Sequence, residues 1–372
     1  MKITLCGNYG DGNFGDELIL EGLIRTLKDF NTKMEITVLS ANPQETIEKF
    51  AKYDVKALNK FPAGIRSFFK GLFNGNFKKT YKEVKSSDFF ILGGGGLFDE
   101  SRKASNLIWG IQAWFAYRLK RKVIMYGQNL GGIKSKLALK YVKRFFRKAE
   151  FIAVRDEDSK NFLRKFIKGK KIMVMPDLVF KIPVKPNTQN AQNDEKSKTT
   201  TANTANTAVL ALRKIKERPQ DFDQNIKNFT KLLKQQNYSV KALNFHRKDA
   251  KYQQEFTENH LDYSDKDAML ESYSKAKIIL GMRLHSILLA IRTRTPFIAL
   301  NYNPKVQNIL ETLGLSQYLL ELDQVTPAKL NKLLIEISHN YAQIQEKLER
   351  ITQHQEESFQ KVEEHLKKAL GI

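Results

Sequence analysis

The chain has 372 residues, a length that suits about two domains. Lys and Arg number 63 against 40 Asp and Glu, which gives a formal net charge of +23, and 41% of the residues are hydrophobic, so a largely disordered or fibrous chain is excluded. The sequence shows no apolar run of membrane-spanning length and no signal-peptide pattern, and its single cysteine, Cys6, allows no internal disulfide, so we expect a cytoplasmic protein.

The first half of the chain alternates short apolar segments with amphipathic ones. This pattern predicts helices over residues 17–29 and 136–148, and strands over residues 2–6, 35–40, 88–92, 122–126, 151–155 and 172–175. Strands that alternate with helices predict parallel βαβ units with right-handed crossovers. We therefore assign residues 1–183 to an N-terminal Rossmann-like domain.

A change of composition separates this domain from a second one. Residues 187–207 are rich in Asn, Thr, Gln, Ala and Lys, so we assign 184–207 to a low-complexity linker or surface insertion. The alternation then returns, with helices predicted over 221–236 and 284–293 and strands over 208–212, 239–244, 277–281 and 297–301. This predicts a second Rossmann-like domain over 208–325, with a ligand cleft between the two domains at the carboxyl ends of their strands.

The last segment, 326–372, is expected to be helical. Thr326-Pro327 is a favourable helix start, and the apolar residues that follow keep a helical spacing. The stretch is too long for one ordinary helix, so a break is expected near His339-Asn340. We expect these helices to pack on the domain body, with a coiled-coil partner interface as the alternative; the oligomeric state stays open.

Two glycine-rich segments follow strands of the first half. The first, Gly10 to Gly15, matches G-x-G-x-x-G, but it begins several residues after its strand and no acidic residue for a ribose ends the next strand. We therefore expect a loop that contacts an anion or a polar ligand through Asn8, Tyr9, Gly10 and Asn13. The second segment contains Gly94, Gly95 and Gly96, which suits either close approach of a ligand or a tight strand-to-helix crossing.

Cationic residues follow three other strands. Arg155 ends the strand 151–155, where its alternative role is pairing with Asp156 or Asp158. His285 begins a helix after the strand 277–281, next to Arg283, and Lys305 follows the strand 297–301. Cations at the carboxyl ends of strands predict a site for a small anion, although His285 alone could be a structural hydrogen-bonding residue. The sequence indicates neither a metal-ligand cluster nor a nucleophile elbow.

Taken together, these segments resemble the polysaccharide pyruvyl transferase family. The matching segments occur in the family's order, at residues 7–10, 13–17, 92–97, 126–128 (which include Gln128), 154–156, 281–285 and 296–306. They cover most of the chain outside the linker and the C-terminal helices. The sequence departs from the family at Gly131-Gly132, where Gly-Pro is usual, and in the longer insertion at 187–207.

The resemblance implies a GT-B-like fold of two Rossmann-type halves and a transferase. It implies that pyruvate passes from phosphoenolpyruvate, a donor substrate and not a cofactor, to sugar hydroxyls of a cell-surface glycan precursor as a cyclic ketal. It further implies that Arg155, His285 and Lys305 bind the donor, to which we add Arg283. Because only His285 among them has a pKa near working pH, we expect it to be the general acid or base. No metal and no cofactor is expected.

Two other functions stay open. One is a GT-B glycosyltransferase that uses a nucleotide sugar, and the other is a non-catalytic, basic glycan- or nucleic-acid-binding protein. Nucleic acid is the less favoured partner because no zinc-ligand pattern, RNA-binding aromatic signature or helix-turn-helix is present. We expect the partner to be a glycan or a lipid-linked sugar acceptor.

A further segment suggests peripheral contact with an anionic membrane at the inner face of the cell. Its aromatic and aliphatic residues share one helical face between basic flanks, a pattern typical of interfacial helices, and a core-facing helix is the alternative. The face comprises Phe61, Ile65, Phe68, Phe69, Leu72 and Phe73, and the flanks comprise Lys60, Arg66, Lys70, Lys78 and Lys79.

Overall fold

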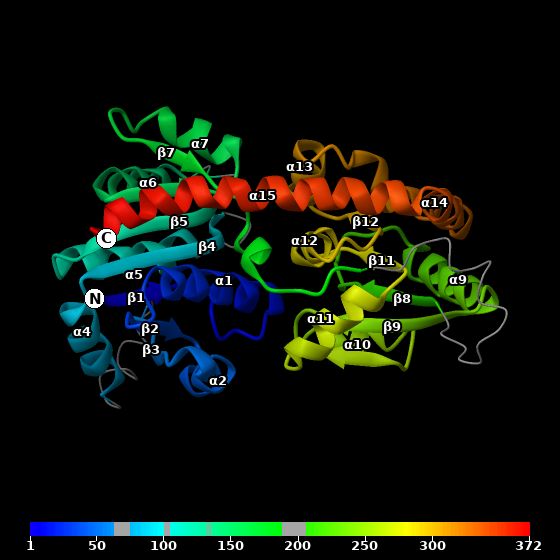
Figure 1. Ribbon diagram of the computed structural model, residues 1–372, viewed down its shortest axis with the longest axis horizontal. Helices are drawn as coiled ribbons and strands as arrows, with labels where there is room; N and C mark the ends of the chain where they lie inside the picture. The colour runs from blue at the N-terminus through cyan, green and yellow to red at the C-terminus, as the bar shows by residue number, and fades with distance from the viewer. Residues whose placement is uncertain (63–74, 100–104, 132, 134, 188–205) are drawn as a thin grey trace. The chain divides into compact units, whose positions relative to one another are not determined.

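The computed structural model describes residues 1–62, 75–99, 105–131, 133, 135–187 and 206–372. The chain forms two compact units (Figure 1). Unit 1 consists of Met1–Ile182 together with Gln355–Ile372, and unit 2 consists of Pro183–His354. Each unit contains its own parallel sheet, as the alternating pattern of the sequence predicts.

The sheet of unit 1 has seven parallel strands in the order β3-β2-β1-β4-β5-β6-β7. The direction of strand addition reverses between β1 and β4, and such a switch point is where open α/β sheets bind ligands. The strands are β1 (Lys2–Cys6), β2 (Glu35–Ser40), β3 (Lys56–Asn59), β4 (Phe89–Asp99), β5 (Lys122–Gly131), β6 (Phe151–Val154) and β7 (Ile172–Val174).

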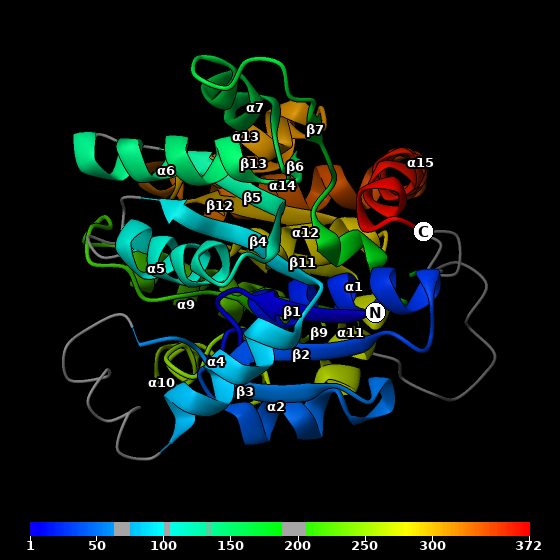
Figure 2. The same ribbon diagram turned by 90° about the vertical axis from the view of Figure 1, so that its left-hand side faces the viewer.

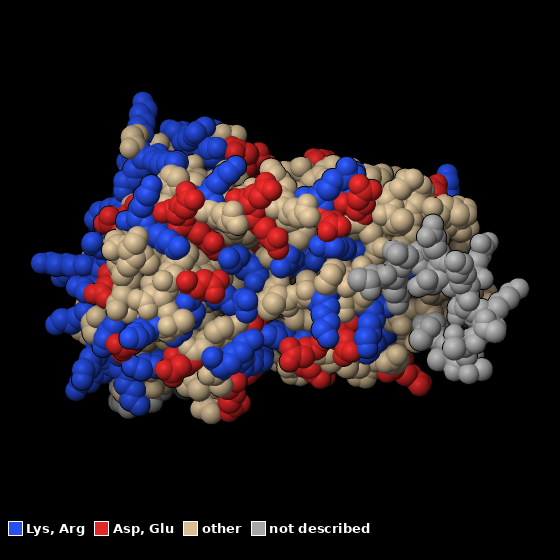
Figure 3. Space-filling model, in the orientation of Figure 1, with Lys and Arg blue, Asp and Glu red and all other residues tan. Residues whose placement is uncertain are grey.

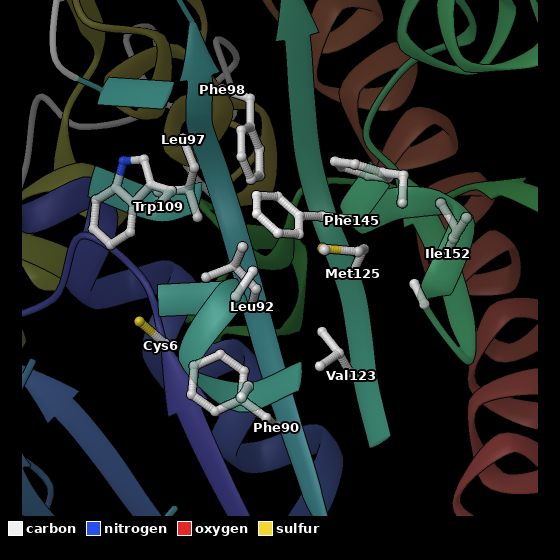
Figure 4. Close-up of a cluster of buried hydrophobic side chains, with 14 of the residues drawn as sticks. Cys6, Phe90, Leu92, Leu97, Phe98, Trp109, Val123, Met125, Phe145 and Ile152 are labelled. Atoms are coloured by element: carbon white, nitrogen blue, oxygen red, sulfur yellow. The ribbon is translucent and has the colours of Figure 1, made fainter. Parts of the chain in front are cut away.

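Helices cover both faces of this sheet (Figure 2). Side chains of α4 (Asn76–Ser86), α5 (Ser105–Arg118), α6 (Lys136–Lys148) and α7 (Glu157–Arg164) join one buried cluster with the strands. In Figure 4, Phe90 and Leu92 of β4 point toward this cluster, which also contains Trp109 of α5 and Phe145 of α6. The opposite face is covered by α1 (Phe14–Phe30) and the 3₁₀ helix η2 (Leu178–Lys181), and α2 (Pro43–Lys49) with the 3₁₀ helix η1 (Ala51–Tyr53) connects β2 to β3.

Unit 2 repeats this topology with six parallel strands in the order β10-β9-β8-β11-β12-β13. Its switch point lies between β8 and β11. The strands are β8 (Asn206–Ala211), β9 (Tyr238–Asn244), β10 (His260–Asp262), β11 (Ile278–Gly281), β12 (Phe297–Asn301) and β13 (Leu319–Glu321). The helices are α9 (Phe222–Gln235), α10 (Ala250–Gln253), α11 (Lys266–Lys275), α12 (Leu284–Arg292), α13 (Pro304–Thr312) and α14 (Pro327–His339), with short 3₁₀ helices η3 (Ser316–Tyr318) and η4 (Leu322–Gln324).

Of the two C-terminal helices, the first belongs to unit 2 and the second is shared by both units. Helix α14 ends at His339 and α15 (Tyr341–Leu370) follows, so the predicted break is confirmed. In unit 2 the Thr352 hydroxyl donates to the Ile291 carbonyl at 3.2 Å. In unit 1 Glu363 accepts from the Thr26 hydroxyl at 3.2 Å and pairs with Lys181 at 2.8 Å. The end of α15 is therefore part of the unit 1 fold and not a separate helical segment.

Several predicted boundaries differ from the structure. The four glycines from Gly93 lie inside β4 and not in a loop after it, and α1 begins at Phe14 instead of residue 17. The predicted linker or insertion at 184–207 differs from the structure at both of its ends. Asn187 is buried and donates from Nδ2 to the Ala276 carbonyl at 2.6 Å, while Asn206 begins β8. Residues 188–205 lie outside the described residues.

The predicted interfacial segment is described only in part. Phe61 is buried in the core, where its ring stacks on Phe115 with 4.2 Å between centroids, so its assignment to a lipid-facing surface is wrong. The other apolar residues of that face lie outside the described residues, as do Arg66 and Lys70. Within the described parts of the chain, no helix is long and apolar enough to cross a membrane.

Candidate functional site

The carboxyl edge of the unit 2 sheet gathers cationic side chains at its switch point. Ala211 at the end of β8 is the register partner of Gly281 at the end of β11, and the Met282 amide donates to the Ala211 carbonyl at 3.1 Å. Arg213 and Arg283 follow these two strand ends directly. Because the carboxyl ends of neighbouring parallel strands meet at one edge, the two arginines begin adjacent loops over the switch point.

Two helix N-termini start at the same edge. His285 is the second residue of α12, and Lys305 is the second residue of α13. The Asn303 side chain caps α13 by accepting from the Lys305 amide at 3.0 Å, and Pro304 fixes the first helical position. Both side chains are half-buried. The first turn of a helix directs unsatisfied N–H groups and a partial positive charge outward, so an anion beside these two side chains would be stabilised.

Arg283 is held by a carboxylate. Its Nε donates to Oδ2 of Asp249 and its Nη2 to Oδ1, both at 2.7 Å, and the Asp249 side chain is only 4% exposed. This bidentate pair occupies two of the donor atoms with which an arginine grips a planar anion. Arg283 therefore presents less of its guanidinium to a donor than the sequence analysis assumed, and it fixes the loop that precedes His285.

Arg213 was missed by the sequence analysis, and the structure places it differently from Arg283. Its Nη1 donates to the Tyr302 hydroxyl at 3.2 Å, and its guanidinium carbon lies 4.9 Å from the centre of that ring. Its buried Nε meets no acceptor in the part of the chain that the structure describes, and no described carboxylate forms an ion pair with it. The signal was available, because Arg213 follows an apolar strand just as Arg155 does.

In unit 1, Arg155 follows β6 and forms an internal ion pair. Its Nη1 lies 2.7 Å from Oδ2 of Asp177, and these side chains are 8% and 2% exposed. Oδ1 of Asp177 accepts from the Val179 amide at 3.0 Å, which caps η2. The partner is thus neither Asp156 nor Asp158; Asp156 instead caps α7 by accepting from the Ser159 amide at 2.7 Å. Donor binding by Arg155 stays a prediction.

The loop after β1 is held by carboxylates of the helix that follows. Asn8 and Asn13 both donate from Nδ2 to Oδ2 of Asp16, at 2.8 and 2.6 Å, and the Gly10 amide donates to Oε1 of Glu17 at 2.9 Å. Two carboxylates therefore already occupy the N-terminus of α1, which makes it a poor place for a second anion. This edge accepts hydrogen bonds instead, which suits hydroxyl groups.

The chain of unit 1 approaches itself closely around this loop. Gly10 has a φ of +73°, and a Cβ there would lie 2.1 Å from the Ser40 hydroxyl oxygen. Tyr9 is buried and its hydroxyl donates to the Gly93 carbonyl at 3.2 Å. The contacts of Tyr9 and Gly10 within unit 1 are therefore enough to account for these two residues of the expected ligand loop.

The glycines of β4 have a packing role at Gly93 and Gly94, and a Cβ at Gly93 would lie 2.8 Å from Cδ2 of Leu23. Gly94 has a φ of +65°, and a Cβ there would lie 2.0 Å from Cγ2 of Ile19 in α1, so the tight strand-to-helix approach accounts for it. Gly96, in contrast, is exposed at the edge. Gln128 is fully buried and donates from Nε2 to the Leu92 carbonyl, which joins β5 to β4.

Burial and charge set the electrostatics of the unit 1 edge. Burial raises the pKa of the Glu17 carboxyl to about 7, although the hydrogen bond from the Gly10 amide opposes the shift. Burial also lowers the pKa of Lys60, which follows β3, while nearby acidic groups, including Asp16 and Glu17, act against that shift. Among the residues that the structure describes, no three His, Cys, Asp or Glu side chains gather as metal ligands.

Comparison with solved structures shows the fold. A glycosyltransferase from Rickettsia africae is 14% identical, with 99% of this chain and 98% of that one covered and a TM-score of 0.61. Anabaena HepE in complex with UDP and glucose is 11% identical, with 100% and 99% covered and a TM-score of 0.58. UDP-GlcNAc 2-epimerase from Neisseria meningitidis is 12% identical, with 94% of each chain covered and a TM-score of 0.59. The predicted GT-B-like α/β fold is confirmed.

Comparison of sequences shows the family. The amylovoran biosynthesis protein AmsJ of Erwinia amylovora is 20% identical over 419 residues, with all of both chains covered. The model of the polysaccharide pyruvyl transferase family matches residues 13–304, which include the β4 glycines, Arg155, Arg213 and His285 but neither residues 7–12 of the loop after β1 nor Lys305. Family and fold together indicate a transferase, and the chain belongs to the polysaccharide pyruvyl transferase family.

Proposed function

We propose that this protein transfers pyruvate from phosphoenolpyruvate to two hydroxyls of a sugar in a glycan precursor and forms a cyclic ketal. The observation that carries the proposal is Arg213, a guanidinium at the unit 2 switch point with no carboxylate partner in the described chain. Phosphoenolpyruvate carries a phosphate and a carboxylate, and each needs a cation in fixed geometry. Arg213, His285 and Lys305 provide three cationic side chains at one edge.

Different cations at this edge bind the two anionic groups of the donor. Arg213 is oriented by the Tyr302 ring and hydroxyl, so its fork meets a planar carboxylate with little loss of side-chain freedom. Lys305 supplies a compact charge at the N-terminus of α13, where the departing phosphate also receives backbone N–H groups. Arg155 of unit 1 is a further donor residue implied by the family resemblance.

The chemistry needs a proton donor beside these cations. His285 gives a proton to the methylene carbon of the donor, and the adjoining carbon becomes cationic. One sugar hydroxyl attacks that carbon and loses its proton, the bond to the phosphate oxygen breaks, and the second hydroxyl closes the ketal. The second hydroxyl also loses its proton when it closes the ketal. The two hydroxyl protons balance the two protons used, one given by His285 to the methylene carbon and one taken by the departing phosphate.

A phosphate-release assay tests the proposed function. We expect acceptor-dependent release of phosphate from phosphoenolpyruvate across a panel of glycans. Arg213→Lys should lower kcat/KM for the donor by roughly 10- to 100-fold, the loss of a charge-assisted hydrogen bond to a bidentate site. Arg350→Lys, at a side chain that is 68% exposed, is the matched control and should leave the value unchanged.

The same assay separates the alternative functions. Nucleotide release from sugar nucleotides without phosphate release from phosphoenolpyruvate would overturn the proposal in favour of a GT-B glycosyltransferase. That alternative is supported by the shared fold with Anabaena HepE, which binds UDP and glucose. Absence of any turnover together with salt-sensitive binding of nucleic acid would favour a non-catalytic binding protein.

A further inference from the structure

The outward face of α6 is a stripe of cations. The sequence of α6 contains no Asp or Glu, and its buried face consists of apolar side chains such as Val142 and Phe145. Its opposite face holds side chains spaced three and four residues apart, namely Lys136, Lys140, Lys143, Arg144, Arg147 and Lys148. Like charges at this spacing destabilise a helix, so the stripe lowers the stability of α6, and the fold itself does not require these charges.

Nothing in the described chain neutralises this stripe. None of its six side chains forms an ion pair with a described carboxylate. Their contacts are with carbonyls and rings: Nε of Arg147 donates to the Phe166 carbonyl at 3.0 Å, and Nζ of Lys143 lies 5.3 Å from the Phe166 ring centre. The charges therefore remain available to an external anion.

The neighbouring helices on the same face of the sheet extend the basic surface. Helices α4, α5 and α6 all contribute to the buried cluster on one sheet face, so their outer sides belong to one flank of unit 1. Helix α5 contains no acidic residue, and α4 exposes Lys78, Lys79, Lys82 and Lys85. Figure 3 shows many Lys and Arg side chains on unit 1, with Asp and Glu side chains among them, in a view from which Figure 2 places α5 and α6 toward the far side.

Apolar side chains are exposed among these cations. Leu137 of α6 is 59% exposed, Trp114 of α5 is 46% exposed and Tyr81 of α4 is 39% exposed. Trp114 and Tyr81 end a row of rings that runs through Phe115 and Phe77, with centroid distances of 4.9, 5.7 and 6.2 Å. A polyanion such as nucleic acid explains the cations, but exposed Leu and Trp between cations are typical of surfaces that enter a lipid headgroup layer.

We propose that this flank of unit 1, formed by the outer faces of α4, α5 and α6, docks on an anionic lipid bilayer. Each Lys or Arg near such a surface strengthens binding about 5-fold, while Trp114 and Leu137 add an apolar contribution that salt does not screen. Docking holds the enzyme where a lipid-linked acceptor would be found, and it does not depend on the identity of the donor.

Vesicle sedimentation of the full chain tests the proposal. The probes are vesicles of phosphatidylcholine alone and of phosphatidylcholine with about one-third phosphatidylglycerol, in low salt and near physiological salt. We expect binding only to the anionic vesicles, and Lys140→Glu/Arg144→Glu/Arg147→Glu should weaken it at least ~100-fold. The control, Lys231→Glu/Lys251→Glu/Lys329→Glu, makes the same change in net charge on exposed residues of unit 2 and should retain most of the binding.

A second variant separates docking from simple charge attraction. Trp114→Ala leaves the charge unchanged, and it should weaken vesicle binding several-fold near physiological salt. Circular dichroism and phosphate release without vesicles should match the wild type for every variant. Equal loss in the α6 variant and the unit 2 control would overturn the proposal, as would binding of duplex DNA that exceeds vesicle binding and falls in the α6 variant.

Discussion

Arg155 connects two roles that can be separated by experiment, an ion pair with Asp177 and contact with the donor. The pair has one hydrogen bond of 2.7 Å between side chains that are 8% and 2% exposed. Removing one partner of such a buried pair leaves an uncompensated charge, which costs about 3–5 kcal/mol. For a unit of about 200 residues, each kcal/mol shifts the Tm by 2–4 °C, so Arg155→Ala and Asp177→Ala should each lower it by roughly 6–20 °C.

The double substitution distinguishes the roles. Replacing both residues by apolar ones, Arg155→Met/Asp177→Leu, removes the buried charges together and should recover most of the lost stability. If Arg155 also contacts the donor, the double variant stays low in kcat/KM for phosphoenolpyruvate even though its Tm recovers. If the pair is purely structural, activity recovers with the Tm.

Thermal unfolding followed by circular dichroism, together with donor kinetics, provides the two measurements. Arg350→Ala is the control, because its partner Glu346 lies 3.8 Å away and both side chains are more than half exposed, so less than about 1 kcal/mol is expected. Single variants at Arg155 and Asp177 that shift the Tm no more than this control would refute the assignment of a buried structural pair.

Three other substitutions test the site and its supports. His285→Ala should lower kcat by ~10²–10⁴-fold with a smaller change in donor binding, measured by steady-state kinetics and donor titration, whereas Lys305→Ala should chiefly weaken donor binding; near-normal turnover of the histidine variant would limit that residue to an anchor. Gly94→Ala should lower the free energy of unfolding by about 1–3 kcal/mol, measured by denaturant unfolding, because its methyl meets Ile19. Adding Ile19→Ala should restore part of this loss, and failure to do so would refute packing as the reason for the glycine. Because the folded-state pKa of Glu17 is raised to about 7 from 4.5, the wild type should lose stability between pH 4.5 and 7, and Glu17→Gln should flatten that part of the pH profile of unfolding.

The sequence predicted only part of the regular structure: helices α1, α6, α9, α12, α14 and α15 were predicted, whereas α2, α4, α7, α10, α11 and α13 were not, although α7 is amphipathic. Alternating strands and amphipathic helices indicated two parallel sheets, and Thr326-Pro327 with the break at Asn340 located α14. Helix α5 was missed because its apolar residues lie on all sides of the helix, so the sequence shows no amphipathic pattern there. The strands β3, β10 and β13 were missed because three or four residues with polar members carry no period of their own.

The predicted site residues divide by whether their partners are close in the sequence. The cap formed by Asn13 and the position of Lys305 after Asn303-Pro304 follow from local rules. The partner of Arg155 does not, because Asp177 is 22 residues away and reaches it only through the pairing of β6 with β7. The carboxyl-edge rule could still have suggested this partner, since Asp177 follows a strand just as Arg155 does.

The two sheet edges differ in charge, which favours different ligands at each. At the unit 1 switch point the first turn of α1 carries Asp16 and Glu17, whose oxygens already bind the loop after β1, and a second anion there would meet repulsion. At the unit 2 switch point the first turns of α12 and α13 carry His285 and Lys305 instead, and Arg213 adds a third cation without a described carboxylate. Both sheets share one strand topology and one switch-point geometry, so topology cannot explain the difference. The side chains in the first turn of each helix do, and this difference supports the proposal that the anionic donor binds at the edge of unit 2.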